Sequence, residues 1–92
     1  MMVLYSPQFN EEKKIVYSFV NNVITATIDT VTDTFDLSLL PDGAEVDDVE
    51  TTLPTKVLIS AINTSGVIHA VLLNWIDGSA TNDECFPLEI TV

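Results

Sequence analysis

The sequence lacks arginine and contains only three lysines and one histidine, whereas 14 of its residues are acidic. The formal net charge is therefore −11 at pH 7. A protein that binds nucleic acid by neutralising phosphates needs a basic surface, which this composition cannot supply. Binding to an anionic membrane surface is disfavoured for the same reason. We accordingly expect neither a nucleic acid nor a membrane among the partners of this protein.

Cysteine and long apolar runs are also scarce. Cys85 is the only cysteine, so no disulfide can form within the chain, and no basic residue that would activate its thiol lies nearby in the sequence. No stretch approaches the roughly 20 apolar residues of a membrane-spanning helix. The short apolar beginning of the chain stops at Pro7 and lacks the pattern of a secretory signal peptide. These features predict a protein that is made in the cytoplasm and stays there or is assembled there into something larger.

Motifs for catalysis are missing as well. The sequence has no phosphate-binding loop, zinc-ligand pattern, serine-hydrolase elbow or dinucleotide fingerprint. The single histidine, His69, could form a nucleophilic pair with Cys85 only with an orienting group and an oxyanion site, neither of which the sequence indicates. We therefore predict that the protein is not an enzyme, has no catalytic residues and uses no cofactor.

One segment, 42–50, is rich in carboxylates. Oxygen ligands of this kind suit Ca²⁺, but the spacing of an EF-hand loop is absent, and a solvated loop that keeps the protein soluble is the interpretation we favour over a metal site. Val46, Val49 and Leu53 have helical spacing, so the segment can hold one or two helical turns or remain an irregular loop. The five acidic residues are Asp42, Glu45, Asp47, Asp48 and Glu50.

The abundant residues favour β-structure. Val, Ile and Thr supply 30 of the 92 residues, and β-branched side chains suit a pleated, half-buried surface. With 47% apolar residues, a chain of this length can bury one modest core. We therefore predict a single all-β domain over 1–92.

Three strands are predicted in the first half of the chain, where apolar and polar residues alternate over 15–19, 23–28 and 31–37. Asn21-Asn22 separates the first two runs, and asparagine tolerates the positive φ that a tight hairpin turn needs. Asp33 falls among the apolar positions of the third run. It lies either near a strand end or as an inward-pointing charge that discourages pairing with another edge.

Three more strands are predicted in the second half. The runs 57–62 and 67–76 are apolar on both faces and are joined by a loop that ends at Gly66, so we place this pair at the centre of the fold. A last strand over 86–92 carries three apolar residues on one face: Leu88, Ile90 and Val92. The prediction is an all-β fold, a small antiparallel sandwich or partly open barrel of about six strands with an acidic connecting loop.

Several short stretches carry a resemblance to known proteins. They are ITATID at 24–29, VTDTFD at 31–36, LPDG at 40–43, LP at 53–54 and LLNWI at 72–76. In these stretches the chain resembles small proteins encoded in the tail and baseplate regions of phages and prophages of Gram-positive bacteria. The resemblance implies a role in a virion or its assembly, and so a virion-associated location as an alternative to the cytoplasm. It implies no catalytic residue.

Two functions follow from these features. The first is a non-enzymatic structural or protein-interaction module, as a tail or assembly component of a phage or prophage. The alternative is an acidic mimic of nucleic acid that inhibits a DNA-binding protein, because closely spaced carboxylates can imitate phosphates. The two functions differ in their dependence on salt, since only the second rests on attraction to a basic partner.

The last predicted strand is the candidate interaction site. An open sheet leaves backbone donors and acceptors unpaired at its edge strands. Residues 86–92 contain no lysine, and only Pro87 and Glu89 discourage pairing with another chain. We therefore predict a homo-oligomer. Its interface includes Leu88, Ile90 and Val92 and excludes 42–50, because every copy brings a charge of −11.

Overall fold

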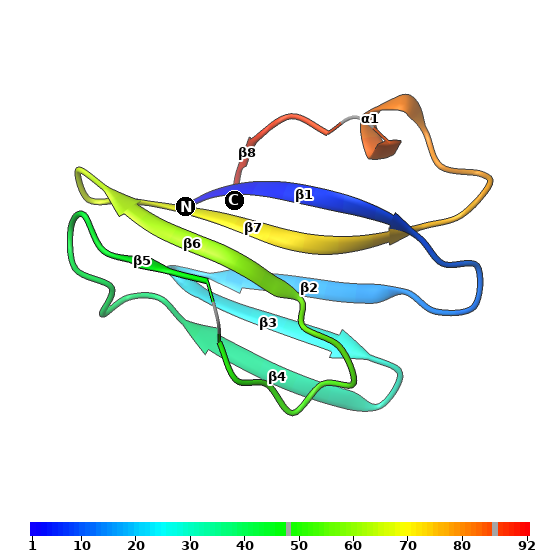
Figure 1. Ribbon diagram of the computed structural model, residues 1–92, viewed down its shortest axis with the longest axis horizontal. Helices are drawn as coiled ribbons and strands as arrows, with labels where there is room; N and C mark the ends of the chain where they lie inside the picture. The colour runs from blue at the N-terminus through cyan, green and yellow to red at the C-terminus, as the bar shows by residue number, and fades with distance from the viewer. Residues whose placement is uncertain (48, 86) are drawn as a thin grey trace.

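The computed structural model describes residues 1–47, 49–85 and 87–92, and there it consists of a five-stranded and a three-stranded sheet that pack face to face (Figure 1). The only helical element in these ranges is a single turn, α1 (Asn82–Cys85). The predicted all-β sandwich is therefore confirmed. The described residues form eight strands rather than about six, because no strand was predicted over Met2–Phe9 or Glu45–Val46.

The three-stranded sheet is an antiparallel meander of β2 (Ile15–Val20), β3 (Val23–Ile28) and β4 (Val31–Asp36). Both of its turns contain a residue with positive φ, Asn21 at 53° and Asp29 at 55°. Asparagine and aspartate adopt this conformation more readily than other non-glycine residues. The predicted hairpin and the third strand that follows it are both confirmed.

The five-stranded sheet has the order β5-β6-β7-β1-β8. Its centre is the antiparallel hairpin of β6 (Leu58–Thr64) and β7 (Val67–Ile76), the pair that was predicted to be central, and β7 is the middle strand. The hairpin turns through Ser65 and Gly66, which both have positive φ.

The sequence pattern predicted no strand before Ile15, but β1 (Met2–Phe9) pairs with β7 over its whole length. This pairing is parallel, whereas only antiparallel pairs were expected. A parallel partner is reached through a long connection, so no local turn in the sequence indicates it. Pro7 fits because β8 pairs only with Met2 and Val3, which leaves the rest of β1 as an edge where proline is tolerated.

Two short segments differ from a simple strand pattern. Of the two alternatives for the acidic segment, helical turns or an irregular loop, its described part forms no helical turn and is irregular apart from β5 (Glu45–Val46), which pairs with β6 and whose Val46 packs against the core. The C-terminal strand, expected over 86–92, is limited to β8 (Ile90–Thr91), which pairs antiparallel with β1. Pro87 lacks the N–H that a longer ladder would need. Phe86, the first residue of the predicted strand, lies outside the described residues.

The inner faces of both sheets share one core. Six large side chains in it are fully buried, namely Val3, Ile24, Ile28, Val57, Leu58 and Leu72. The Tyr17 hydroxyl of β2 donates a hydrogen bond to the Leu73 carbonyl of β7 and so joins the two sheets. Asp33 is an inward charge with partners, since its Oδ2 accepts hydrogen bonds from the Thr51 hydroxyl at 2.7 Å and from the Thr52 N–H at 3.0 Å.

Candidate interaction surfaces

The predicted interaction residues lie together at one edge of the five-stranded sheet, where β8 is the last strand. We call Leu88, Ile90 and Val92 the C-terminal edge. Their exposed fractions are 83%, 43% and 39%, which is unusual for large apolar side chains so close together. Only Met2 and Val3 pair with β8, so its opposite side faces no described strand.

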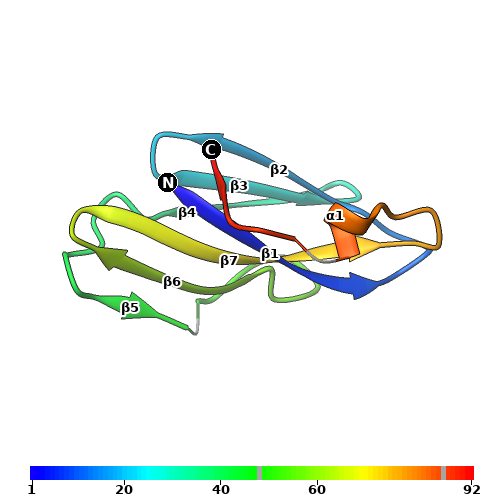
Figure 2. The same ribbon diagram turned by 90° about the horizontal axis from the view of Figure 1, so that it is seen from above.

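The C-terminal segment is attached to the sheet by a small number of bonds. The Val92 N–H donates to the Met1 carbonyl at 3.0 Å, so the two chain ends lie side by side (Figure 2). His69 Nδ1 lies 2.9 Å from Glu89 Oε2, with both side chains partly exposed. A hollow of about 310 Å³ lies beneath the segment and is lined by Tyr5, Pro87, Leu88 and Ile90.

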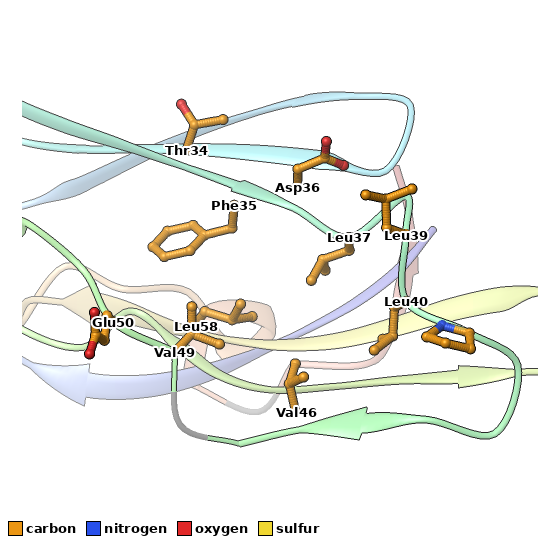
Figure 3. A pocket seen from close by; sticks show the side chains of 11 residues that line it. Thr34, Phe35, Asp36, Leu37, Leu39, Leu40, Val46, Val49, Glu50 and Leu58 are labelled. Atoms are coloured by element: carbon orange, nitrogen blue, oxygen red, sulfur yellow. The ribbon is translucent and has the colours of Figure 1, made fainter.

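A second surface lies between two other edge strands of the sandwich, β4 and β5. β4 ends the three-stranded sheet and β5 ends the five-stranded sheet, at the edge opposite β8. Between them is an apolar groove of about 400 Å³, which we call the β4–β5 groove (Figure 3). Most of its lining is apolar: Phe35, Leu37, Leu39, Leu40, Pro41, Val46, Val49 and Leu58.

The turn that leaves β4 builds one wall of this groove. Asp36 Oδ1 accepts hydrogen bonds from the Ser38 hydroxyl and the Ser38 N–H, and these bonds lower the pKa of Asp36. The Leu40 N–H then donates to the Leu37 carbonyl at 3.2 Å. Farther along, Asn63 Nδ2 of β6 donates to the Leu40 carbonyl at 2.8 Å, which ties the turn to the opposite sheet. This anchored turn leaves Leu39 87% exposed at the rim.

The charged groups that line the β4–β5 groove are both carboxylates, Asp36 and Glu50. In Figure 3 Asp36 points away from the hollow, while Glu50 lies at one end of it. The lysines have partners in the described structure. Lys13 and Lys14 each lie 3.0 Å from a carboxylate, and Lys56 Nζ donates to the Asp47 carbonyl at 2.6 Å.

The other candidates from the sequence are not brought together into a site. His69 contacts Glu89, and Cys85 is a free, half-buried cysteine. Within the described ranges, no group of three His, Cys, Asp or Glu residues could hold a metal ion. Asp48 of the acidic segment lies outside these ranges. Trp75 is partly buried and packs against the core.

Sequence reasoning missed the β4–β5 groove, because its lining comes from separate parts of the chain, within 34–41, within 46–50 and at Leu58. One local signal was available. Leu39-Leu40-Pro41 places two leucines in a turn just after a strand, where polar residues are the usual choice. An apolar turn of this kind either packs against something or presents its side chains to solvent, and here Leu40 does the first and Leu39 the second.

Comparisons of this chain with protein families, with curated proteins and with solved structures found no match. No helix in the described residues is long and apolar enough to cross a membrane.

Proposed function

We propose that this protein is a non-enzymatic structural or interaction module that associates with further copies of itself through the C-terminal edge. The observation that carries the proposal is an edge strand with exposed apolar residues and no lysine. Pairing with a second copy would satisfy its backbone groups and cover Leu88 and Ile90. Each apolar side chain buried in this way contributes on the order of 1.5–3 kcal/mol before the costs of association.

Electrostatics supports this edge over the opposite one. Two copies with a charge of −11 repel each other, so their contact is least unfavourable where few carboxylates lie. Glu89 is the only acidic residue from 87 to 92, whereas five acidic residues occur over 42–50. Together with the resemblance to phage tail-region proteins, this favours a repeating assembly component, located in a virion or in the cytoplasm before assembly.

Sedimentation of the purified protein tests the proposal. We expect the wild-type chain to form an oligomer at high micromolar concentration and Ile90→Lys to shift it toward monomer. Val16→Lys is the matched control, because Val16 is 64% exposed on the outer face of the three-stranded sheet and the change in charge is the same. A wild-type chain that stays monomeric, or a control that dissociates as readily as Ile90→Lys, contradicts the proposal.

The alternative function is inhibition of a DNA-binding protein by mimicry of nucleic acid. The dependence of binding on salt concentration distinguishes it from the structural role. Salt screens the repulsion between two copies of charge −11 and so should favour the contact between strands, whereas carboxylates that imitate phosphates lose attraction to a basic partner as salt rises. Capture of a DNA-binding protein at low salt that is released at higher salt would favour mimicry. Presence of the protein in purified phage particles would favour the structural role.

A further inference from the structure

We propose that the β4–β5 groove is a second binding site, which takes an apolar side chain carried on a cationic segment of another protein. Its volume of about 400 Å³ is within the range of ligand-binding clefts. The C-terminal edge lies at the other end of the five-stranded sheet, so both surfaces can be occupied at once.

The floor of the groove provides the apolar part of the site. Phe35 and Leu37 of the three-stranded sheet face Leu58 of the five-stranded sheet across the hollow (Figure 3), and each is less than 10% exposed. These residues belong to the core, so the floor is held by the packing of both sheets. A floor fixed in this way needs little rearrangement to accept a ligand, which lowers the entropic cost of binding.

The rim is also held in place before any ligand arrives. Leu39 is 87% exposed, yet the turn that carries it is fixed by the Asn63 side chain on the Leu40 carbonyl. Val46 and Val49 form the facing wall and are only partly buried. An apolar group that enters the groove therefore covers Leu39 and both valines, which would otherwise remain against water.

Charge selects the kind of segment that carries the apolar group. The charged residues lining the groove are the carboxylates Asp36 and Glu50, and the exposed Glu45 and Asp47 lie on either side of Val46 in the sequence. A lysine or arginine next to the inserted side chain would be attracted to this surface, whereas an acidic neighbour would be repelled.

The same argument disfavours a second copy of this chain as the occupant. Val16 and Val20 of this chain are also exposed, at 64% and 68%, but they are shorter side chains on the paired strand β2. Of the larger exposed residues outside the groove, Leu88 precedes Glu89, and Phe9 is followed closely by Glu11 and Glu12. Either would bring carboxylates to a carboxylate-lined groove. The occupant is therefore a different protein with basic residues beside a leucine- or phenylalanine-sized side chain.

Three short peptides probe the site in the full-length protein by NMR: acetyl-KLKFK-amide, acetyl-ELEFE-amide and acetyl-KSKSK-amide. We expect the first to give saturable shifts of the methyl resonances of Leu39, Leu40, Val46 and Val49, with an affinity that falls as salt is added. The second and third peptides should produce at most small shifts there. Equal binding of the acidic peptide, or equal binding of the serine peptide, would overturn the proposal.

Matched variants locate the binding. Leu39→Ser should weaken the affinity for acetyl-KLKFK-amide about tenfold, while Phe9→Ser, at a 63% exposed apolar residue at the end of β1 and outside both proposed surfaces, should leave it unchanged. Glu50→Gln should weaken it about two- to fivefold, while Glu11→Gln, at an exposed glutamate between β1 and β2, should have less effect. Because all four positions are exposed, the variants should fold. Loss of binding in the control variants to the same extent would contradict a site in the groove.

Discussion

The two sheets of this protein are assembled in different ways. The three-stranded sheet joins strands that follow each other in the sequence through tight turns, so every one of its pairings is local. The five-stranded sheet depends on the parallel pair of β1 and β7, and these two strands are separated by most of the chain. The first sheet can be specified by short stretches of sequence, whereas the second is specified only when the whole chain has collapsed around a shared core.

The largest effect should come from the shared core, and it tests whether the two sheets are one cooperative unit. Leu72 lies at the centre of the five-stranded sheet and Ile24 at the centre of the three-stranded sheet, both with no exposed surface. We expect Leu72→Ala and Ile24→Ala each to lower the free energy of unfolding by about 2–5 kcal/mol in urea denaturation. Val16→Ala, at an exposed position, should change it by less than about 0.5 kcal/mol.

A single unfolding transition is expected in all these variants. Two separated transitions, or a variant in which one sheet's signal survives while the other is lost, would show that the sheets fold independently. The sheet with local pairings and the sheet with the distant pairing would then differ in stability as well as in how they assemble.

The next effect concerns the hydrogen bond that crosses between the sheets. Tyr17→Phe removes the hydroxyl that donates to the Leu73 carbonyl, and we expect a loss of about 0.5–1.5 kcal/mol in the free energy of unfolding. Tyr5→Phe is the matched control, because the Tyr5 ring of β1 lies tilted against the Tyr17 ring, with centroids 5.8 Å apart, but its hydroxyl has no partner among the described residues. An equal loss in both variants would assign the effect to removal of a hydroxyl from this part of the core rather than to the hydrogen bond to Leu73.

The same tyrosine makes the stability depend on alkaline pH. Burial raises the pKa of Tyr17 above its ordinary value, and the nearby Tyr5 raises it further. The folded state therefore keeps the phenol proton more firmly than the unfolded state, so this stabilisation is complete below about pH 10 and is lost as the pH rises above it. Tyr17→Phe should weaken that loss. An unchanged alkaline profile would contradict this assignment.

A smaller effect is expected at Asp33, which connects the edge of the three-stranded sheet to the segment leading into the five-stranded sheet. Hydrogen bonds from the Thr51 hydroxyl and the Thr52 N–H lower the pKa of Asp33. Its contribution is therefore present above about pH 4 and is lost as the pH falls below that value. Asp33→Ala should lower the free energy of unfolding at pH 7 by up to about 1 kcal/mol.

Glu11→Ala is the control for Asp33→Ala, because removing any negative charge from a chain of −11 relieves repulsion. The difference in the free energy of unfolding between Asp33→Ala and Glu11→Ala measures the contribution of the hydrogen bonds to Asp33. It should shrink at low pH in thermal melts, and a difference that grows on acidification would contradict the role given to Asp33.

The smallest effect should come from the exposed ion pairs. Lys14 before β2 lies 3.0 Å from Asp77 after β7 and so bridges the sheets, whereas Lys13 lies 3.0 Å from Asp29 within the three-stranded sheet. Hydrogen bonds from Ser79 are the main cause of the lowered pKa of Asp77, about 2, and Lys14 contributes less. We expect Lys14→Gln and Lys13→Gln to lower the melting temperature slightly and equally. A much larger fall in melting temperature for Lys14→Gln would show that the ion pair between the sheets contributes to stability more than an ordinary exposed ion pair does.

Local patterns in the sequence were enough to predict the elements that pair with sequence neighbours. Alternation located β2, β3 and β4, and residues that tolerate positive φ marked the turn at Asn21. Apolar runs placed the hairpin of β6 and β7 at the centre. β1 was missed because Pro7 interrupts its pattern and because its partner is distant in the sequence.

The candidate sites show the same contrast. The C-terminal edge could be predicted from one short stretch, because Leu88, Ile90 and Val92 alternate in a segment without lysine. The β4–β5 groove could not, because its floor combines Phe35 and Leu58, which are brought together only when the two sheets stack. A concave site between two sheets forms only through tertiary packing. The alternation of apolar and polar residues along the sequence therefore does not predict it.

The parallel pair of β1 and β7 also determines the order in which the protein can form during its synthesis. β1 is synthesised well before its partner strand β7, which is completed only when Ile76 has been added. At about 5 to 20 residues per second, β1 remains without its partner for on the order of several seconds, while the meander of β2, β3 and β4 is already available. For that interval Val3 and Tyr5 are exposed on a nascent chain, and a chaperone or a neighbouring nascent chain can reach them before the sandwich closes.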